Sequence, residues 1–494
     1  MRDRRLTIAL AVAVVLVLAR SAVFLFWEQA GFDADQAIFG LMAKHLVEGR
    51  AFPIFIYGDS YLLAMQSWLA APLFALFGPS VAALKVPVIA INAITGALLV
   101  SVLHRDAGLR PWLALMAAMF YLLAAPAIAK LLVETGGGNP EPFLYVLLLW
   151  TLRDRPWPFG LLFGLGFVHR EFTAYGVSAI VAISLLADRR LNPERLKAVA
   201  YAGAGFFIVT QAVRTAYLFS TPFGPGTSIQ VSEAAFGESA LASRYCFAPE
   251  TIVPGLSGLF ANYFGTVFGA TSERLVTFGV RSQMPATIAF WPVLGAVFVV
   301  ALARVAWLSV RDRKPIWTGT AAVGTFLLLI GLQSGVVYAV ARCGRLEPDT
   351  IRYALLMLYA GVGIATLYFV YETSRFWQRA MVGAIATWTV VTAVTHVRLL
   401  DEYVRREPVY PHRELASYLV DRGIEYARAD YWTAYATTFL AGERVIVAST
   451  DTVRITPYQQ AVEEHRDAAV TVQRQPCANG QGDEAVSGAY WVCR

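Results

Sequence analysis

Runs of apolar residues, many of them close to 20 residues long, recur through most of this chain and constrain its fold more than any other feature. A helix needs about 20 apolar residues to cross the hydrocarbon core of a bilayer. The first run, residues 6–27, is longer than the apolar core of a signal peptide and ends in the aromatic anchor Phe-Leu-Phe-Trp. The runs do not alternate with polar residues, which excludes a β-barrel. The sequence therefore predicts an α-helical polytopic membrane protein.

Composition agrees with this fold class, because 57% of the 494 residues are hydrophobic and only 15% are charged. Soluble proteins average about 25% charged residues. Hydropathy and loop charge together predict about 11 transmembrane helices. They cover residues 6–27, 81–103, 111–132, 141–152, two spans within 157–187, 198–218, 285–308, 316–340, 353–371 and 378–396.

The net charge of +6 comes largely from short arginine clusters between these runs. By the positive-inside rule, these clusters place the N-terminus on the cytoplasmic side of a bacterial inner membrane. A nucleic-acid partner is not expected, because no basic patch carries interleaved aromatic residues.

The predicted topology divides the chain into two domains. Residues 1–396 form the transmembrane domain, with external loops at 28–80 and 219–284. Residues 397–494 are more polar and are predicted to form a small α/β domain on the periplasmic side, with helices near 415–423 and 432–441 and strands at 424–428 and 444–449.

All four cysteines fall on the periplasmic side of this topology. An oxidising compartment favours disulfides, so Cys477 with Cys493 and Cys246 with Cys343 are candidate pairs. Four unpaired thiols are the alternative.

Two aspartates, Asp33 and Asp35, stand at the start of an amphipathic helix directly after the first span. Asp33 suits an N-cap, and Gln36 three residues later would complete a capping box. A cap needs only one carboxylate, so capping does not explain the presence of Asp35. A carboxylate at the water–lipid boundary is well placed to act as a base on a substrate whose depth is fixed by a lipid tail.

The stretch Asp35-Gln-Ala-Ile-Phe-Gly40 resembles the Phe-Asp-Glu-x-His-Phe-Gly motif of membrane glycosyltransferases of the GT-C type. These include protein O-mannosyltransferases and the aminoarabinose transferases of lipid A. The resemblance implies that Asp35 is catalytic, with Asp33 assisting, and that a soluble C-terminal domain lies outside. Gln36 departs from the family's usual Glu, so a divalent cation, Mg²⁺ or Mn²⁺, stays an open question.

Further polar residues at the outer boundary are candidates for binding the substrate. The stretch from Pro53 to Tyr61 resembles the family's segment between two surface helices. Glu134 and Glu141 flank a triple glycine whose backbone can approach a ligand closely, or which simply forms a flexible turn.

Two groups of charged residues interrupt later apolar stretches. His169, Arg170 and Glu171 either line a cavity, with Arg170 holding a phosphate, or form an internally paired turn. Arg352-Tyr353 opens a late span, as an Arg-Tyr pair does in GT-C transferases. An arginine there suits a phosphate, and snorkelling to the headgroups is the alternative.

The function predicted from these residues is transfer of a sugar from a polyprenyl-phosphate donor to an unknown acceptor at the outer face of the membrane. A transporter or flippase of lipid-linked glycans is the first alternative, and it predicts paired repeats and broken spans. The second is an oligosaccharide ligase of another fold.

Overall fold

The computed structural model describes most of the chain, and all structural statements below concern that part. The described residues are 4–27, 31–59, 61–188, 192–220, 246–269, 276–277, 280–281, 291–342, 346, 348–477, 482–486 and 488–493.

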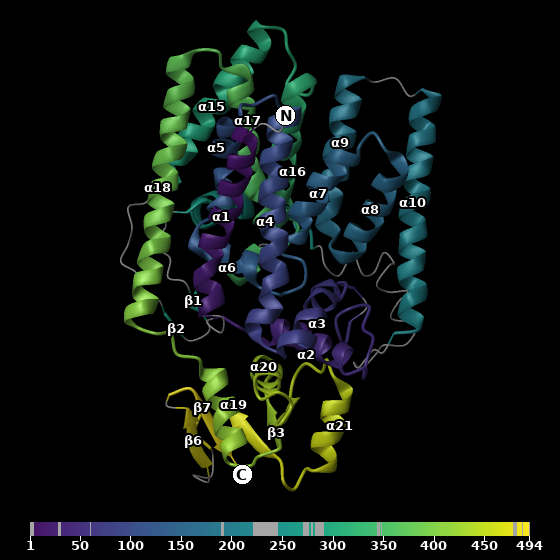
Figure 1. Cartoon of the computed structure of the whole chain (residues 1–494), viewed down its shortest axis with the longest axis vertical. Helices are drawn as coiled ribbons and strands as arrows, with labels where there is room; N and C mark the ends of the chain where they lie inside the picture. Colours follow the sequence, from purple (N-terminus) through teal and green to yellow (C-terminus); the bar gives the residue numbers. More distant parts are fainter. Residues whose placement is uncertain are drawn as a thin grey trace.

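A bundle of long helices forms the body of the molecule, and a small α/β domain lies at one end of it (Figure 1). The helices of the bundle are α1 (Arg4–Phe26), α4 (Val81–Asp106), α5 (Pro111–Leu122), α6 (Pro126–Val133), α7 (Glu141–Leu152), α8 (Pro156–His169), α9 (Ala174–Ala187), α10 (Pro193–Leu218), α15 (Trp291–Arg311), α16 (Ala322–Val340), α17 (Leu358–Tyr371) and α18 (Arg375–Arg405). The last of these runs along the whole bundle to the α/β domain (Figure 1).

Seven described helices are long and apolar enough to cross a membrane, or eight if the bent pair α5–α6 counts as one span. The prediction of about 11 spans is therefore not confirmed. The predicted span at 111–132 is bent by 81° between the two helices, where Pro126 lacks the N–H that would continue α5. The predicted spans at 141–152 and 157–187 are helices of 12 to 14 residues, about 20 Å long and too short to cross a bilayer alone.

Hydrogen bonds between helices hold the apolar bundle together at a few points. Arg20 of α1 is 1% exposed and donates to Asn92 of α4 at 2.9 Å. Tyr121 of α5 donates to the same amide oxygen at 3.1 Å. Such polar contacts help to hold helices together within a bilayer, where the hydrophobic effect does not drive one helix against another.

Two short helices, α2 (Ala34–Val47) and α3 (Met65–Phe77), lie between the bundle and the α/β domain (Figure 1). The helix α2 matches the amphipathic helix predicted after the first span. Its buried side chains include residues that pack against the domain, so α2 is enclosed from both sides. In the segment 219–284, predicted to be external, the described helices are α13 (Ile252–Gly258) and α14 (Phe264–Phe268). Two strands of two residues each, β1 (Val276–Thr277) and β2 (Val280–Arg281), pair in the antiparallel direction.

The C-terminal domain contains a five-stranded sheet in the order β4-β3-β5-β7-β6. Strands β3 (Tyr426–Ala429), β4 (Ile446–Ser449) and β5 (Val470–Gln473) are parallel, and β7 (Tyr490–Cys493) and β6 (Gly482–Val486) add antiparallel strands at one edge. Its helices are α19 (Pro411–Asp421), α20 (Tyr431–Leu440) and α21 (Thr456–Glu464). The predicted α/β character of the tail and its first two helices and strands are confirmed.

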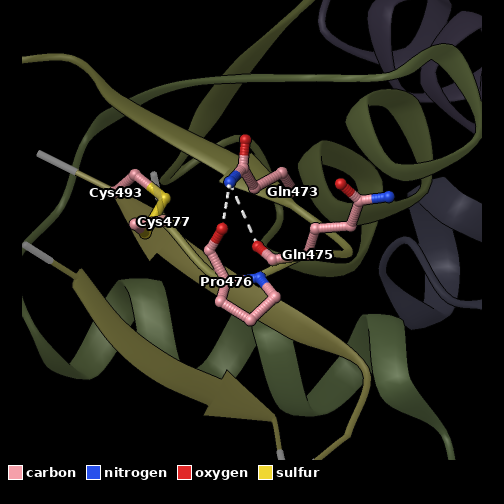
Figure 2. Close-up of a disulfide and its surroundings, with 5 residues drawn as sticks. All are labelled: Gln473, Gln475, Pro476, Cys477 and Cys493. Carbon is pink, nitrogen blue, oxygen red and sulfur yellow. Dashed lines mark hydrogen bonds between the residues drawn. A yellow bond between two sulfur atoms is a disulfide. The ribbon is translucent and has the colours of Figure 1, made fainter. Parts of the chain in front are cut away.

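One of the two predicted disulfides lies within the described residues. Cys477, which follows β5, is bonded to Cys493 of β7. Figure 2 shows that Gln473 donates to the carbonyl oxygens of Gln475 and Pro476 at 3.1 and 3.2 Å, which shapes the turn before this bridge. The second predicted pair includes Cys343, which lies outside the described residues.

Candidate active site

The first turn of α2 carries both aspartates. Asp33 is the N-cap, and its side chain accepts from the backbone N–H of Gln36 at 3.0 Å, as predicted. Gln36 does not complete a capping box, because its amide donates instead to the carbonyl of Gly31 at 2.8 Å. Burial, followed by the negative charges of Asp35 and Glu134, raises the pKa of Asp33 to about 7. Asp33 can therefore hold a proton near neutral pH.

Asp35 receives a hydrogen bond on each carboxylate oxygen, from two distant parts of the chain. Nη1 of Arg352 lies 3.3 Å from Oδ2. The phenol of Tyr431, at the start of α20, donates to Oδ1 at 2.6 Å. Asp35 thus lies where the membrane helices, α2 and the C-terminal domain meet.

Three arginines surround the ring of Tyr353. The guanidinium carbons of Arg342, Arg352 and Arg170 lie 4.6, 5.4 and 5.8 Å from the ring centre, within the range of cation–π attraction. Among the described residues, neither Arg170 nor Arg342 forms an ion pair with a carboxylate, and the Nε of each is buried without a partner. This arginine cluster, Arg170, Arg342 and Arg352, is a concentration of positive charge able to bind an anion.

A cavity of about 250 Å³ opens beside the arginine cluster. It is lined by Tyr61, Arg170, Glu171, Phe172, Tyr175, Val337, Tyr338, Ala341, Arg342 and Tyr353. The lining combines positive charge, one carboxylate and several aromatic rings. Its two arginines provide N–H donors for a phosphate, and the phenol groups provide further hydrogen bonds.

Within the triple glycine, Gly136 to Gly138, the last residue makes room for Arg170 of the arginine cluster. At Gly138, whose φ is +93°, a Cβ atom would lie 2.4 Å from Cγ of Arg170. At Gly136, a Cβ atom would lie 3.8 Å from Nη1 of Arg352. The glycines were predicted to let the backbone approach a ligand. In this structure Gly138 admits the side chain of Arg170 and Gly137 that of Leu62, whereas the contact of Gly136 with Arg352 is of ordinary length.

Six predicted residues meet at this site. Asp35 contacts Arg352, and Arg352 lies against Tyr353. The remaining ones, Tyr61, Arg170 and Glu171, line the cavity with Tyr353. In the described part of the chain no ion pair joins Arg170 to Glu171, and both residues line the cavity, which favours the cavity interpretation over the internally paired turn.

Three of the predicted substrate-binding residues lie outside both the cavity lining and the contact between Arg352 and Asp35. His169 is buried and its Nδ1 is 2.9 Å from the hydroxyl of Tyr145. Glu141 is 1% exposed and accepts from Gln66 at 2.7 Å. Glu134 pairs with Lys130 at 3.4 Å. These contacts give each of them a packing or pairing role, and substrate binding by them stays a prediction.

Two site residues were not predicted from the sequence. Arg342 lies ten residues before Arg352, just after the end of α16, and only Arg352 of the two was predicted to bind a phosphate. Tyr431 belongs to the aromatic run Asp-Tyr-Trp-Thr-Ala-Tyr of the tail, a pattern equally typical of a small hydrophobic core. No local signal connects either residue with Asp35.

The described residues contain no group of three or more His, Cys, Asp or Glu side chains placed to hold a metal ion. Mg²⁺ is often held by only one or two carboxylates together with substrate phosphates. Binding of a divalent cation therefore stays a prediction.

A buried ionic cluster attaches the C-terminal domain to α2. Glu443 accepts from His45 at 3.0 Å, from Tyr458 at 2.6 Å and from Arg50 at 3.1 Å, and also pairs with Lys44. Burial opposes ionisation of Glu443, but the hydrogen bonds from these donors outweigh it and hold the pKa of Glu443 well below its usual range. The cluster keeps Tyr431 within reach of Asp35.

A second contact at the same interface is apolar. A Cβ atom at position 40 would lie 2.5 Å from the ring of Phe439 in α20. Gly40 therefore allows the ring to pack directly on the backbone of α2, although glycine disfavours a helix by about 1 kcal/mol relative to alanine. Helix α2, and with it Asp35, is clamped between the bundle and the domain.

No protein-family model matches the chain, and no curated protein matches it significantly. The fold is similar to those of solved membrane transferases, which agrees with the resemblance seen in the first loop. Among solved structures it is similar to ArnT from Cupriavidus metallidurans bound to undecaprenyl phosphate, with a TM-score of 0.60, 11% identity, and coverage of 100% of this chain and 98% of that chain.

The oligosaccharyltransferase AglB from Archaeoglobus fulgidus, in complex with an inhibitory peptide and a dolichol-phosphate, has a similar fold. The TM-score is 0.53 and the identity 11%, over 95% of this chain and 69% of that chain. The apo form of the Archaeoglobus fulgidus oligosaccharyltransferase gives a TM-score of 0.52 at 12% identity, over 96% of this chain and 70% of that chain.

Proposed function

We propose that this protein transfers a sugar from a polyprenyl-phosphate donor to an acceptor at the outer face of the bacterial inner membrane. The observation that carries the proposal is the arginine cluster next to Asp35. It gathers positive charge for a leaving phosphate beside a carboxylate that can accept a proton. In this orientation the N-terminus is cytoplasmic and the C-terminal domain is periplasmic.

The shape of the site supports a donor with an anionic head and a long apolar tail. A second cavity, of about 390 Å³, is lined almost entirely by apolar residues of the segment 256–268 and of α15, α16 and α17. Both cavities are lined in part by α16: Val336 belongs to the apolar cavity, and Val337 belongs to the cavity beside the arginine cluster. The segment before α17 also contributes to both cavities, with Tyr353 in the cavity beside the arginine cluster and Met357 in the apolar cavity. The head would lie on the arginine cluster and the tail would follow α16 into the apolar cavity.

The proposed step uses residues already described. The acceptor's hydroxyl oxygen forms a bond to the anomeric carbon of the sugar, and its proton passes to Asp35. The bond between that carbon and the donor's phosphate oxygen breaks, and polyprenyl phosphate leaves with the bonding electrons. Arg170 and Arg342 stabilise the negative charge that develops on this phosphate, while Arg352 orients Asp35. Asp33 assists by keeping α2 capped.

The similar solved structures support the same donor class. The solved ArnT structure is bound to undecaprenyl phosphate, and the AglB structure is a complex that includes a dolichol-phosphate. Both ligands are polyprenyl phosphates, which is the head-and-tail chemistry inferred from the two cavities.

The test is transfer by the purified wild-type protein in proteoliposomes supplied with polyprenyl phosphates that carry radiolabelled hexoses or pentoses. The readout is label covalently attached to extracted envelope glycans, lipids or proteins, together with release of polyprenyl phosphate. The proposal predicts both. Movement of intact labelled lipid across the bilayer without release of the phosphate would instead identify a flippase.

A further inference from the structure

Tyr431 is fixed at both its backbone and its side chain. Its backbone N–H donates to Asp451 at 2.8 Å. Asp430 caps α20 by accepting from the N–H of Trp432 at 3.0 Å and of Thr433 at 3.2 Å. The first turn of α20 therefore cannot rotate without breaking several hydrogen bonds.

The ring of Tyr431 is held by neighbours that also join the domain to the external loop. It is 6% exposed and lies 5.4 Å from the ring of Tyr435. The hydroxyl of Tyr435 accepts from the backbone of Arg454 at 2.6 Å, and the side chain of Arg454 pairs with Asp59 at 3.0 Å. Loop 28–80, α20 and Asp35 thus form one connected assembly.

The phenol of Tyr431 is a hydrogen-bond donor at any physiological pH. Burial, followed by the negative charge of Asp35, holds the pKa of Tyr431 well above its usual range. The hydroxyl is only 2.6 Å from Oδ1 of Asp35, the short distance typical of a donor to a charged oxygen.

We infer that the C-terminal domain completes the active site, with Tyr431 as a positioning residue for Asp35. Arg352 holds Oδ2 from the membrane side and Tyr431 holds Oδ1 from the domain side, so the plane of the carboxylate is fixed. An ionised carboxylate has about four acceptor positions. Two donors leave room for the acceptor's hydroxyl, whose approach is restricted to the remaining directions. The inference rests on the proposed function.

Positioning of this kind acts on the chemical step and leaves donor binding alone, because the arginine cluster and the apolar cavity do not include Tyr431. Removing the hydroxyl with Tyr431→Phe should lower kcat about 10-fold and leave the KM for the lipid donor unchanged. The matched control is Tyr426→Phe, because Tyr426 stacks on His465 in the same domain, 4.1 Å between ring centres, and has no contact with Asp35.

The experiment measures kcat and donor KM for the wild type, Tyr431→Phe, Tyr426→Phe, Asp35→Ala and the double variant Asp35→Ala with Tyr431→Phe. Action through Asp35 predicts that Tyr431→Phe causes no further loss once the carboxylate is gone. Melting temperatures of the single variants confirm that all are folded.

Two kinetic results would overturn the inference while the proposed function stands. One is a Tyr431→Phe variant as active as Tyr426→Phe. The other is an equal further loss in the Asp35→Ala background, which would mean that Tyr431 acts elsewhere. Absence of transfer by the wild type would overturn the proposed function, and this inference with it.

Discussion

The guanidinium of Arg352 lies 3.3 Å from the carboxylate of Asp35, although 317 residues separate them in the chain. Arg352 belongs to the 3₁₀ segment Pro348–Met357 that leads into α17, and Asp35 stands in the first turn of α2. This pair joins α2 to the segment that leads into α17 and couples the carboxylate to the arginine cluster.

Arg352→Gln should lower kcat about 100-fold, because it removes both the orienting donor and a positive charge beside the leaving phosphate. Arg352→Lys should recover part of the loss, since lysine keeps the charge but lacks the planar fork. Arg304→Gln is the matched control, because Arg304 also pairs with a buried carboxylate, Glu372, at the far end of α17. A loss of similar size in the Arg304 variant would show that the effect is one of general stability.

Glu443→Gln should loosen the C-terminal domain from α2. The change leaves Lys44 and Arg50 beside a neutral group in a largely buried cluster, and breaking such a network costs about 3–5 kcal/mol. Because the pKa of Glu443 is lowered in the folded protein, its stabilising contribution is present above the ordinary pKa and is lost as pH falls.

The measurements for Glu443→Gln are the melting temperature and the rate of limited proteolysis within the domain. Glu463→Gln is the control, because Glu463 pairs with Arg428 at the surface and such pairs contribute about 0–1 kcal/mol. Equal melting temperatures for the two variants at neutral pH would contradict the role assigned to the cluster.

Gly138→Ala should weaken donor binding. The new methyl group would lie 2.4 Å from Arg170, and the φ of +93° is unfavourable for alanine, so Arg170 must move away from the cavity. We expect the donor KM to rise about 10-fold with a smaller change in kcat. Gly203→Ala, at a helical position with open space around the Cβ, should leave the KM unchanged, and a normal KM for Gly138→Ala would refute the assigned position of Arg170.

Asp33→Asn should stabilise the protein only at higher pH. The folded-state pKa of Asp33 is about 7, above its ordinary value of about 3.9, so the free energy of unfolding falls as pH rises between these two values. Asparagine is also a good N-cap and has no charge to bury. The melting temperature of Asp33→Asn should exceed that of the wild type by about 2 °C at pH 8 and match it at pH 4. A difference independent of pH would argue against the raised pKa.

Local patterns in the sequence were sufficient for the features that depend on neighbouring residues. The helix at α2, the cap at Asp33 and the α/β pattern of the tail each follow from residues within a few positions of one another. The resemblance to a known family marked Asp35 and Arg352 as separate candidates, but their pairing was not predicted, because no spacing rule connects two such distant residues.

The remaining features depend on packing that a single sequence does not reveal. Hydropathy measures the length of an apolar run, so it cannot detect the bend before Pro126 or distinguish the short helices α7 to α9 from full spans. Similarly, Tyr431 and Arg342 reach the site only because the domain and the end of α16 are folded against it.

The most direct test of the central claim is the rate of sugar transfer from a radiolabelled polyprenyl-phosphate donor by Asp35→Asn. This variant keeps the shape of the side chain but removes the charge that accepts the proton, so kcat should fall by about 10²–10⁴-fold while polyprenyl phosphate still binds. Asp401→Asn, in an exposed pair with Arg405, should transfer at the wild-type rate. Full activity of Asp35→Asn would contradict the assignment of Asp35 as the catalytic carboxylate.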